Sequence, residues 1–338
     1  MILLKKAIKY EFWPFWLFYI PVGFYGLILS LRARSITFFT TVNPCMEYSG
    51  GLEYSKMEYF QLLTDELLRK TVLINKDIET DNLNRLIEEE SFSFPLIIKP
   101  DKGQRGVEVQ KINDINALKL FLSSASRQKF LLQEFIDYPI ELGVFIIKTP
   151  DGKRREITSV TKKKFLTIKG DGESTFKNLV VKNIRAVNRK NEFEKKYKLQ
   201  WNTIVEKNKE IILEPIGNHN RGTEFIDAND LISNELLEVM DRISLYLPEF
   251  YYGRIDLKTK SIDDLYKGKN IKLLEINGVN SEPSHIYDKN ISILTAYKDL
   301  FKHMNIMYEI SRQNKITKGI KHASFKEILK GIYKLYNY

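Results

Sequence analysis

The chain has 338 residues, of which 43% are hydrophobic and 28% are charged, and its formal net charge is +10. This length supports one large or two medium-sized domains with a substantial core. The single cysteine, Cys45, excludes an intrachain disulfide framework or a cysteine-based metal site, and the four histidines lack zinc-like spacing. The basic excess favours an anionic partner such as a nucleotide, an anionic substrate or lipid head groups, whereas we find no nucleic-acid recognition motif.

Residues 12–31 (FWPFWLFYIPVGFYGLILSL) are uncharged and are flanked by basic residues on both sides. Their length is near that of a membrane-spanning helix, but Pro14 and Pro21 would kink or break such a helix, and the dense aromatic residues are typical of membrane interfaces. No small-residue cleavage site follows, which argues against a signal peptide. We expect a surface or re-entrant anchor at the inner face of a membrane, in the cytoplasm; a true span and a hydrophobic arm packed on the protein or on a second subunit are the alternatives.

The next part of the chain mixes helices and strands. Residues 35–50 predict a short strand and a turn, and Ser55 is expected to cap the helix that follows. We expect helices at 55–69, 78–90 and 113–125, and strands at 71–74, 94–99, 107–112 and 129–136.

The second half of the chain continues this mixture. The turn Pro150-Asp151-Gly152 after strand 141–148 predicts a hairpin. Further expected elements are a strand, a Gly-Asp-Gly turn and a helix capped near Ser174 in 164–182, a solvated helical insert at 184–210, two strands in 211–227, and helices at 229–247 and after 290. Because strands and helices do not alternate strictly, we predict an α+β fold.

Residues 251–284 predict two strands, FYYGRIDL and IKLLEING, joined by a polar excursion. Alternation along a strand places Arg254 and Asp256 on one face of the first strand, and Glu275 and Asn277 on one face of the second. Antiparallel pairing would bring Asp256 beside the other two oxygen donors. Two carboxylates and an amide oxygen, completed by substrate phosphates, are typical of Mg²⁺ sites. An ordinary solvated surface is the alternative for this stretch taken alone.

Three segments in this order resemble the ATP-grasp superfamily of carboxylate–amine ligases: FPLIIKPDKGQRG at 94–106, LLQEFIDYPIELG at 131–143, and the strands of 251–284. D-alanine–D-alanine ligase and the ATP-grasp part of cyanophycin synthetase are the most similar familiar members. The resemblance implies an ATP-grasp fold with a nucleotide cleft between two α+β subdomains. It also implies a ligase that uses ATP and Mg²⁺ to join a small-molecule carboxylate to an amine through an acyl phosphate.

With this resemblance we expect three parts of the chain. Residues 1–50 would form a hydrophobic N-terminal arm with a remnant of the domain that usually precedes an ATP-grasp domain. Residues 51–300 would form the ATP-grasp domain, with a subdomain boundary near 130–140. Residues 301–338 would form basic C-terminal helices, which either pack on the domain or provide a second contact with an anionic membrane.

The resemblance also implies a set of metal and phosphate ligands. Asp256, Glu275 and Asn277 would bind magnesium, with Glu275 able to bridge two ions. Arg254 would reach the transferring phosphate as a catalytic residue, unless it forms a salt bridge with one of these acids. Lys99 would also bind phosphate, because a lysine at the end of an apolar strand needs an anion.

Other residues would hold the nucleotide. Lys56 matches an earlier nucleotide-binding lysine, and the loop with Gly103, Arg105 and Gly106 would fold over the phosphates, although an ordinary turn is the alternative. The backbone around Gln133, Glu134, Phe135 and Ile136 would border the adenine, and Glu141 would bind the ribose hydroxyls. For Glu134 and Glu141 ordinary surface acids are the alternative.

The second substrate is not identified by the resemblance. Candidate contacts lie in two polar loops, namely Arg221, which can hold a carboxylate, and Asn280, Ser281, His285 and Tyr287. Phosphoryl transfer to another acceptor, a non-catalytic membrane-attached nucleotide-binding scaffold, and a homodimer remain open alternatives.

Overall fold

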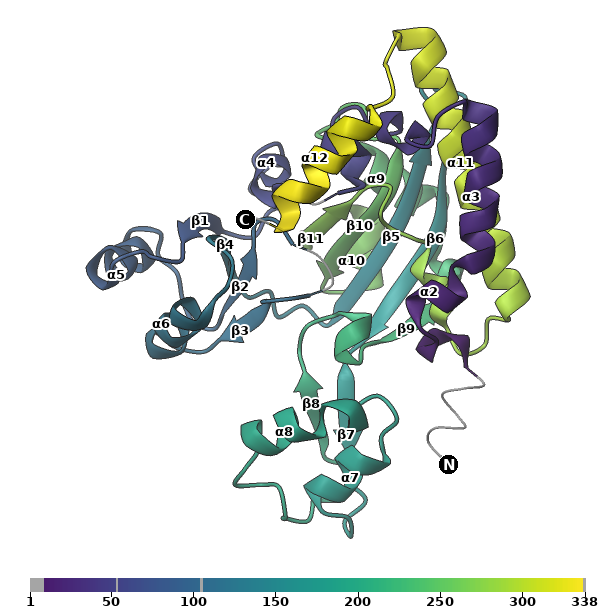
Figure 1. Cartoon of the computed structure of the whole chain (residues 1–338). Coiled ribbons are helices and arrows are strands. Elements are labelled where there is room, and N and C mark those ends of the chain that lie inside the picture. Colours follow the sequence, from purple (N-terminus) through teal and green to yellow (C-terminus); the bar gives the residue numbers. More distant parts are fainter. Residues whose placement is uncertain (1–8, 53, 104–105, 337–338) are drawn as a thin grey trace.

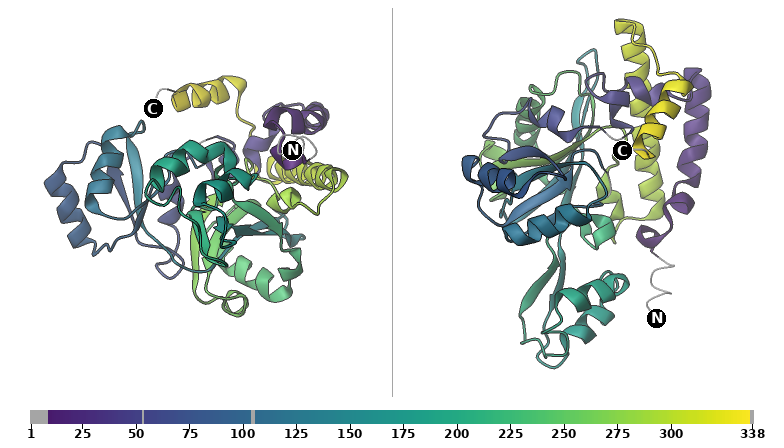
Figure 2. Two further views of the ribbon diagram at one scale, coloured as in Figure 1. Left: turned by 90° about the horizontal axis from the view of Figure 1, so that it is seen from below. Right: turned by 60° about the vertical axis from the view of Figure 1, so that its left-hand side comes forward.

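The computed structural model describes residues 9–52, 54–103 and 106–336 (Figure 1). Its strands form a four-stranded sheet in the order β1-β4-β2-β3, a five-stranded sheet in the order β11-β10-β5-β6-β9, and a two-stranded sheet of β7 and β8. The chain passes from the first sheet to the second between Glu134 and Ile140. Figure 2 shows the two larger sheets side by side, with the small sheet projecting below them.

The first sheet forms an α+β unit with its own core. Its strands are β1 (Thr71–Asn75), β2 (Leu96–Pro100), β3 (Gln110–Ile112) and β4 (Lys129–Glu134), and its helices are α5 (Thr80–Glu89) and α6 (Ile115–Ser124). Helix α6 begins where predicted because Asp114 accepts a hydrogen bond of 2.8 Å from the Ala117 amide. Strand β3 is shorter than the predicted 107–112. Leu96, Ile98 and Phe130 are fully buried between the sheet and these helices.

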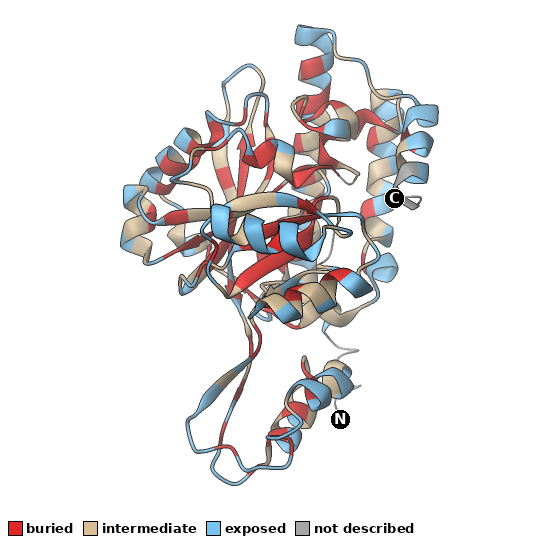
Figure 3. Ribbon diagram, turned by 90° about the vertical axis from the view of Figure 1, so that its left-hand side faces the viewer, coloured by how far each residue is buried: buried red, intermediate tan, exposed pale blue. Residues whose placement is uncertain are grey.

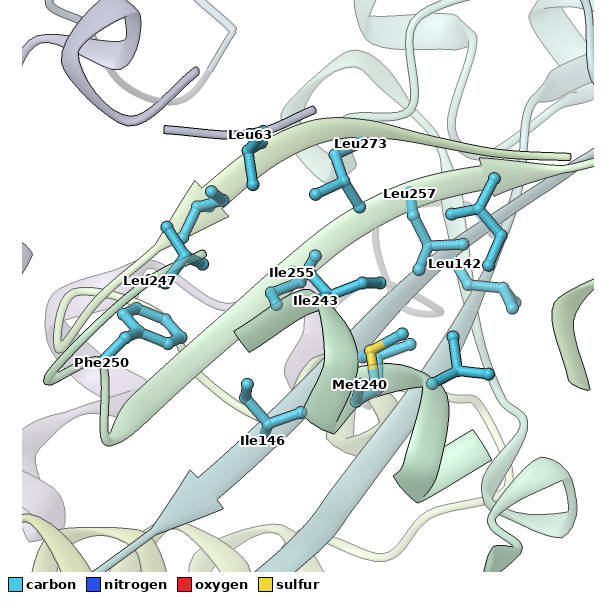
Figure 4. Packing of buried hydrophobic residues seen from close by; sticks show 14 of the residues in the cluster. Leu63, Leu142, Ile146, Met240, Ile243, Leu247, Phe250, Ile255, Leu257 and Leu273 are labelled. Carbon is cyan, nitrogen blue, oxygen red and sulfur yellow. The ribbon is translucent and has the colours of Figure 1, made fainter. Parts of the chain in front are cut away.

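The second sheet is the centre of the molecule. It contains β5 (Ile140–Lys148), β6 (Arg155–Lys164), β9 (Glu224–Asp227), β10 (Tyr252–Thr259) and β11 (Ile271–Asn277), and the predicted hairpin joins β5 to β6. Helices α9 (Asn234–Ser244) and α10 (Ile262–Lys267) cover one face, where Met240 and Ile243 pack against Ile146 and Ile255 (Figure 4). Helix α11 (Ile293–Lys318) covers part of the other face, where Ile306 and Ile310 meet Tyr252.

The predicted alternation along β10 decides which side chains reach each face. Ile255 and Leu257 belong to the core under α9 and α10, whereas Tyr252 belongs to the core under α11. Arg254 and Asp256 share the face of Tyr252, because they follow it at intervals of two residues. They therefore lie on the side of the sheet that α11 only partly covers.

Residues 165–215 contain a small lobe, in which the strand and helix predicted at 164–182 are present and the segment 184–210 differs from the prediction (Figures 1 and 3). It comprises β7 (Leu166–Lys169), α7 (Phe176–Lys182), η4 (Val187–Arg189), α8 (Lys190–Lys196) and β8 (Glu210–Glu214). The predicted solvated insert at 184–210 instead buries Phe193 and Trp201 in a core of its own. The cap of α7 is Thr175, one residue after the predicted Ser174, whose hydroxyl bonds to Asp171.

The segment before the first sheet also differs from the prediction. Residues 35–50 form two 3-10 helices, η2 (Phe38–Thr41) and η3 (Glu47–Gly50), and no strand. The side chain of Asn43 bonds to the backbone of Tyr251 and Tyr252, which holds this segment against the end of β10 as a compact loop. The helix predicted at 55–69 is the short α4 (Lys56–Phe60), and Ser55 caps it by accepting from the Glu58 amide at 3.4 Å.

The N-terminal arm consists of η1 (Tyr10–Phe12), α2 (Phe15–Phe18) and α3 (Ile20–Ala33), and it lies along α11 (Figures 1 and 2). Pro14 caps α2 and Pro21 lies in the first turn of α3, so both prolines begin helices. Within the described ranges, no helix combines the length and apolar character needed to cross a bilayer. One face of the arm packs on the protein, where Phe18, Val22 and Leu29 are buried.

The remaining elements are short 3-10 helices and a C-terminal helix. The 3-10 helices are η5 (His219–Arg221), η6 (Asn229–Leu231) and η7 (Ser284–Tyr287), and the C-terminal helix is α12 (Phe325–Tyr336). Helix α12 packs on the segment that precedes α4, because Ile328 is buried and Gly331 lies against Tyr48 and Leu52.

Candidate active site

A cavity of about 760 Å³ is lined by residues of both larger sheets, the arm and α11. Most of the predicted site residues line it, although they come from segments far apart in the sequence. These residues are Lys56, Lys99, Gly103, Gly106, Phe135, Ile136, Glu141, Arg254, Asp256, Glu275, Asn277, Asn280, Ser281 and Tyr287. Arg105 lies outside the described residues.

The predicted antiparallel pairing of β10 with β11 is present. Arg254 pairs with Asn277 and Asp256 pairs with Glu275, so the four side chains share one face of the sheet. A bulge follows Asp256, which changes the register for the rest of the pair. The sheet therefore fixes three oxygen-bearing side chains and one guanidinium as neighbours.

Asp256 is buried and is held by two cations. Arg254 Nε and Nη2 lie 2.7 and 3.2 Å from the two carboxylate oxygens of Asp256. The salt bridge that was the alternative role for Arg254 is therefore present. The Nζ atom of Lys163 lies 3.1 Å from Asp256 Oδ2. Burial alone would raise the pKa of Asp256, but Arg254 and Lys163 outweigh it and hold that pKa below its usual value.

Lys163 is a site residue that sequence reasoning missed. It is buried in β6, and its Nζ also lies 3.1 Å from Glu141 Oε1, so it links the predicted ribose ligand to Asp256. Burial alone would lower the pKa of Lys163, but the two carboxylates outweigh it and raise that pKa. The available signal was strand alternation, because Ser159, Thr161 and Lys163 follow one another on the buried face of β6.

Gly143 makes room for this cluster. A Cβ atom there would lie 2.9 Å from Asp256 Oδ1 and 3.0 Å from Arg254 Cδ. Strand β5 runs beside β10 with Gly143 opposite Asp256, so a side chain at this position would meet the cluster directly. Gly217 likewise leaves space for Glu141, since a Cβ atom at this position would overlap the Glu141 carboxylate.

The two predicted nucleotide-binding lysines reach the cavity from different elements, Lys99 from β2 and Lys56 from α4. Lys99 is the penultimate residue of β2 and is buried, with Nζ donating to the Leu274 carbonyl at 3.0 Å and lying 5.0 Å from the centre of the Phe60 ring. Burial, followed by the charge of Arg69, holds the pKa of Lys99 well below its usual value. Lys56 Nζ donates to the Gly103 carbonyl at 2.7 Å and lies 3.9 Å from Glu275 Oε1.

Only part of the predicted adenine border lies on the cavity wall. Phe135 and Ile136 line the cavity, and Lys258 Nζ donates to the Ile136 carbonyl at 2.8 Å. Lys258 also lines the cavity, and sequence reasoning missed it. The Gln133 side chain is buried within the first sheet, with Nε2 donating to Thr71 Oγ1 at 2.8 Å, and the Glu134 side chain is exposed to solvent. The predicted contact of these two residues with adenine is made by their backbone and stays a prediction.

Two of the predicted substrate contacts are placed elsewhere. Arg221 lies outside the cavity wall, since its Nε donates to Glu214 Oε2 of the small lobe at 2.9 Å. His285 is buried outside it, with its ring nitrogens 2.8 Å from Ser159 Oγ and 3.1 Å from Asp299 Oδ2. The existing partners of both side chains argue against a role in holding substrate.

The chemistry of the predicted metal ligands fits magnesium. Among the described residues no three His, Cys, Asp or Glu side chains form a complete metal site. Asp256, Glu275 and Asn277 offer hard oxygen atoms, an incomplete set of the kind that phosphate oxygens and water complete around Mg²⁺. The buried Asn277 Nδ2 has no hydrogen-bond partner, which leaves this amide free to turn its oxygen toward a cation.

Comparison with known families agrees with this arrangement. Residues 55–151, which contain the first sheet and the beginning of the second, match the model of the RimK-like ATP-grasp domain. The predicted resemblance to the ATP-grasp superfamily and the α+β ATP-grasp fold are confirmed. Within that superfamily the matching model is the RimK-like one. No curated protein matches the chain in sequence.

Several solved structures are similar to the chain at low identity. The bifunctional glutathione synthetase from Pasteurella multocida has 16% identity and a TM-score of 0.39 over 73% of this chain and 36% of its own. The D-alanine–D-alanine ligases from Bacillus anthracis and Coxiella burnetii have 15% and 9% identity and TM-scores of 0.42 and 0.43. Both matches cover 78% of this chain, with 68% and 59% of the ligases. The chain thus spans about a third of the glutathione synthetase, and these TM-scores carry no argument about its activity.

Proposed function

We propose that the protein is an ATP- and Mg²⁺-dependent ligase that joins a carboxylate to an amine through an acyl phosphate. The observation that carries this proposal is the register of β10 and β11, which aligns Arg254, Asp256, Glu275 and Asn277 on one cavity wall. Lys99 of the RimK-like domain lines the same cavity. Such a site holds phosphates between cations and has no need of a nucleophile of its own.

The reaction has two balanced steps. A carboxylate oxygen of the substrate attacks the γ-phosphorus of ATP, and ADP leaves. The amine nitrogen then attacks the acyl carbon, phosphate leaves, and the amine loses a proton. Both steps gather negative charge on phosphate oxygens, so a catalyst gains most from fixed cations near those oxygens.

The cations of the site are suited to this task. Lys99 reaches the cavity from the first α+β unit and Lys56 from α4, whereas Lys163 and Arg254 reach it from the second sheet. ATP held between them would have its phosphates contacted from both sides, with Phe135 and Ile136 bordering the base. Asp256, Glu275 and Asn277 would hold magnesium, which when bound offsets the charge of the phosphates.

The direct test is ADP release from Mg-ATP in the presence of pooled carboxylates and amines. Asp256→Asn and Glu275→Gln should abolish substrate-stimulated release, whereas Glu88→Gln, a change at an exposed carboxylate of α5, should not. A condensed product in mass spectra would establish ligation, and a phosphorylated product would instead establish phosphoryl transfer. ATP binding without turnover on any pool would contradict the ligase and favour a nucleotide-binding scaffold.

We also propose that the arm lies on a membrane surface. One side of α3 exposes Phe24, Leu27 and Leu31 at 67%, 53% and 79%. Arg32 and Arg34 are exposed at its end, and Lys298 and Lys302 lie beside Pro21 in a second cavity. An apolar stripe with basic neighbours favours an anionic bilayer surface.

Vesicle sedimentation tests this second proposal. The protein should bind phosphatidylcholine vesicles that contain phosphatidylserine more strongly than vesicles without it. Combined serine substitutions of Phe24, Leu27 and Leu31 should remove binding, whereas Leu199→Ser, at a position 95% exposed on the small lobe, should leave it unchanged. Unchanged binding by the triple variant would refute the arm as the contact, and a dimer lost in that variant would identify the stripe as a subunit interface.

A further inference from the structure

The cavity extends well beyond the residues that would hold ATP and magnesium. Past Arg254 and Asn277 it continues between the N-terminal arm and α11, and we name this end the arm chamber. Its wall is formed largely by aromatic and aliphatic side chains: Trp13, Phe15, Phe18, Tyr19 and Val22 of the arm, and Leu300, Met304 and Met307 of α11.

The arm chamber has a well-fixed wall. Tyr10 donates a hydrogen bond of 3.1 Å to the Ile291 carbonyl, and Tyr297 donates one of 2.9 Å to the Phe18 carbonyl. The Phe18 ring stacks between Tyr10 and Tyr297, with centroid separations of 5.4 and 5.2 Å. Since these contacts join the arm to the body of the protein, the arm is an integral wall of the cavity.

Polarity changes along the cavity. Arg254, Asp256 and Glu275 lie at the reactive end. Tyr252 and His303 lie between this charged end and the apolar arm chamber, and the tyrosine hydroxyl is 3.1 Å from His303 Nδ1. Burial lowers the pKa of His303 to about 3, so this ring is neutral at physiological pH. On the arm side the charge of Glu11 is paired with Arg185. A ligand that fills both ends therefore needs one charged end and one apolar end.

The arm chamber also communicates with the outer surface of the arm. Phe15 lines the chamber and is nevertheless 57% exposed, and its neighbour Trp16 is 68% exposed. The chamber is therefore bordered by exposed apolar side chains of α2, beside which a chain too long for the chamber can emerge.

We propose that the carboxylate substrate is amphipathic, with its carboxylate beside Arg254 and an aliphatic chain in the arm chamber. This inference rests on the proposed ligase function and adds the class of its substrate. Burial of methylene groups is favourable at each carbon, so affinity should rise with chain length until the chamber is full. A short polar acid would leave the apolar wall in contact with water.

Quenching of Trp13 fluorescence measures chain binding independently of ATP turnover. In a W16F/W201F background, Trp13 is the remaining tryptophan, and 12-bromododecanoic acid below its micellar concentration brings a heavy-atom quencher to the chamber. We expect saturable quenching. Val22→Phe and Met307→Phe should weaken it about tenfold or more by filling the chamber from two different elements, whereas Leu27→Phe, on the exposed face of α3, should not.

ADP release from the same protein tests the ligase activity separately from the class of its substrate. We expect dodecanoate to stimulate release with the amine pool, and acetate to have no effect. Release stimulated by short polar acids, with no quenching of Trp13, would overturn the amphipathic substrate and leave the ligase intact. Equal quenching in all variants would mean that 12-bromododecanoic acid binds as an adventitious additive only. This result would also overturn the amphipathic substrate. Saturable quenching with no ADP release from any acid would refute the ligase, and with it the substrate assigned here.

Discussion

Lys163→Met should destabilise the protein, because it removes the cation that Lys163 places between two buried carboxylates. Lys163 Nζ lies 3.1 Å from both Glu141 and Asp256, and the side chains of all three residues are at most 6% exposed. Methionine keeps most of the volume of the lysine stem and removes the cation. Asp256 retains Arg254 at 2.7 Å, whereas Glu141 loses this ion-pair partner.

The expected loss follows from the cost of an unpaired buried charge. Removal of one partner from a buried ion pair costs about 3–5 kcal/mol. Because Arg254 still neutralises Asp256, we expect the lower end of this range, about 3 kcal/mol, in the free energy of unfolding. That is a large part of the 5–15 kcal/mol typical of a folded domain.

The measurement is urea unfolding at several pH values, with Lys162→Met as the matched control. Lys162 is the exposed neighbour of Lys163 on the same strand, so its substitution changes the net charge equally. In the native protein the pKa of Asp256 is lowered, so its stabilising contribution is present above the usual aspartate pKa near 4 and is lost as the pH falls below it.

The variant should show a different pH dependence. Without Lys163 the pKa of Asp256 rises, its carboxyl protonates at a higher pH, and the gap between variant and native protein narrows as the pH falls. A loss within about 1 kcal/mol of the Lys162→Met control at pH 7 would refute the reasoning. So would a gap that widens toward acidic pH.

Three further predictions concern single positions. Gly143→Ala should reduce ADP release about tenfold or more, because its Cβ would lie 2.9 Å from Asp256 Oδ1, whereas Gly23→Ala, with open space around its Cβ, should not; equal rates would contradict this. Burial raises the pKa of Glu282 to about 7, so stability should fall by up to about 3 kcal/mol as the pH rises from about 4.5 to 7. Glu282→Gln should remove that slope in urea unfolding, and parallel profiles would argue against it. Ser55→Ala should cost about 1 kcal/mol in thermal unfolding through loss of the α4 cap, and an unchanged melting temperature would count against the cap.

The part of the site on β10 and β11 could be predicted because strand alternation is local information. Knowing that Arg254 and Asp256 share a face requires only a strand, and the register with Glu275 follows once the two strands pair. Lys163 was harder to predict because it lies in a run of three lysines. Which of the three points inward depends on the phase of β6, which its partner strands fix.

The arm and the small lobe could not be derived from composition. An uncharged aromatic segment can pack against either lipid or protein, and its sequence does not distinguish the two. The inner face of residues 12–31 packs against α11. Charged residues at 184–210 outnumber Phe193 and Trp201, yet these two rings make a core when β7 and β8 pair beneath them. Arg221, which follows the lobe in the sequence, forms an ion pair with Glu214 of β8.

The contacts that hold the arm also govern when the nascent chain can complete its fold. Tyr10 bonds to the Ile291 carbonyl across 281 positions, and Phe18 is bonded by Tyr297 across 279. At about 5–20 residues per second, the ribosome needs roughly 15–60 s to deliver α11 after the arm has been made. During that interval the aromatic rings of the arm lack their native partners on α11, so the arm is among the last parts of the protein to reach its final packing.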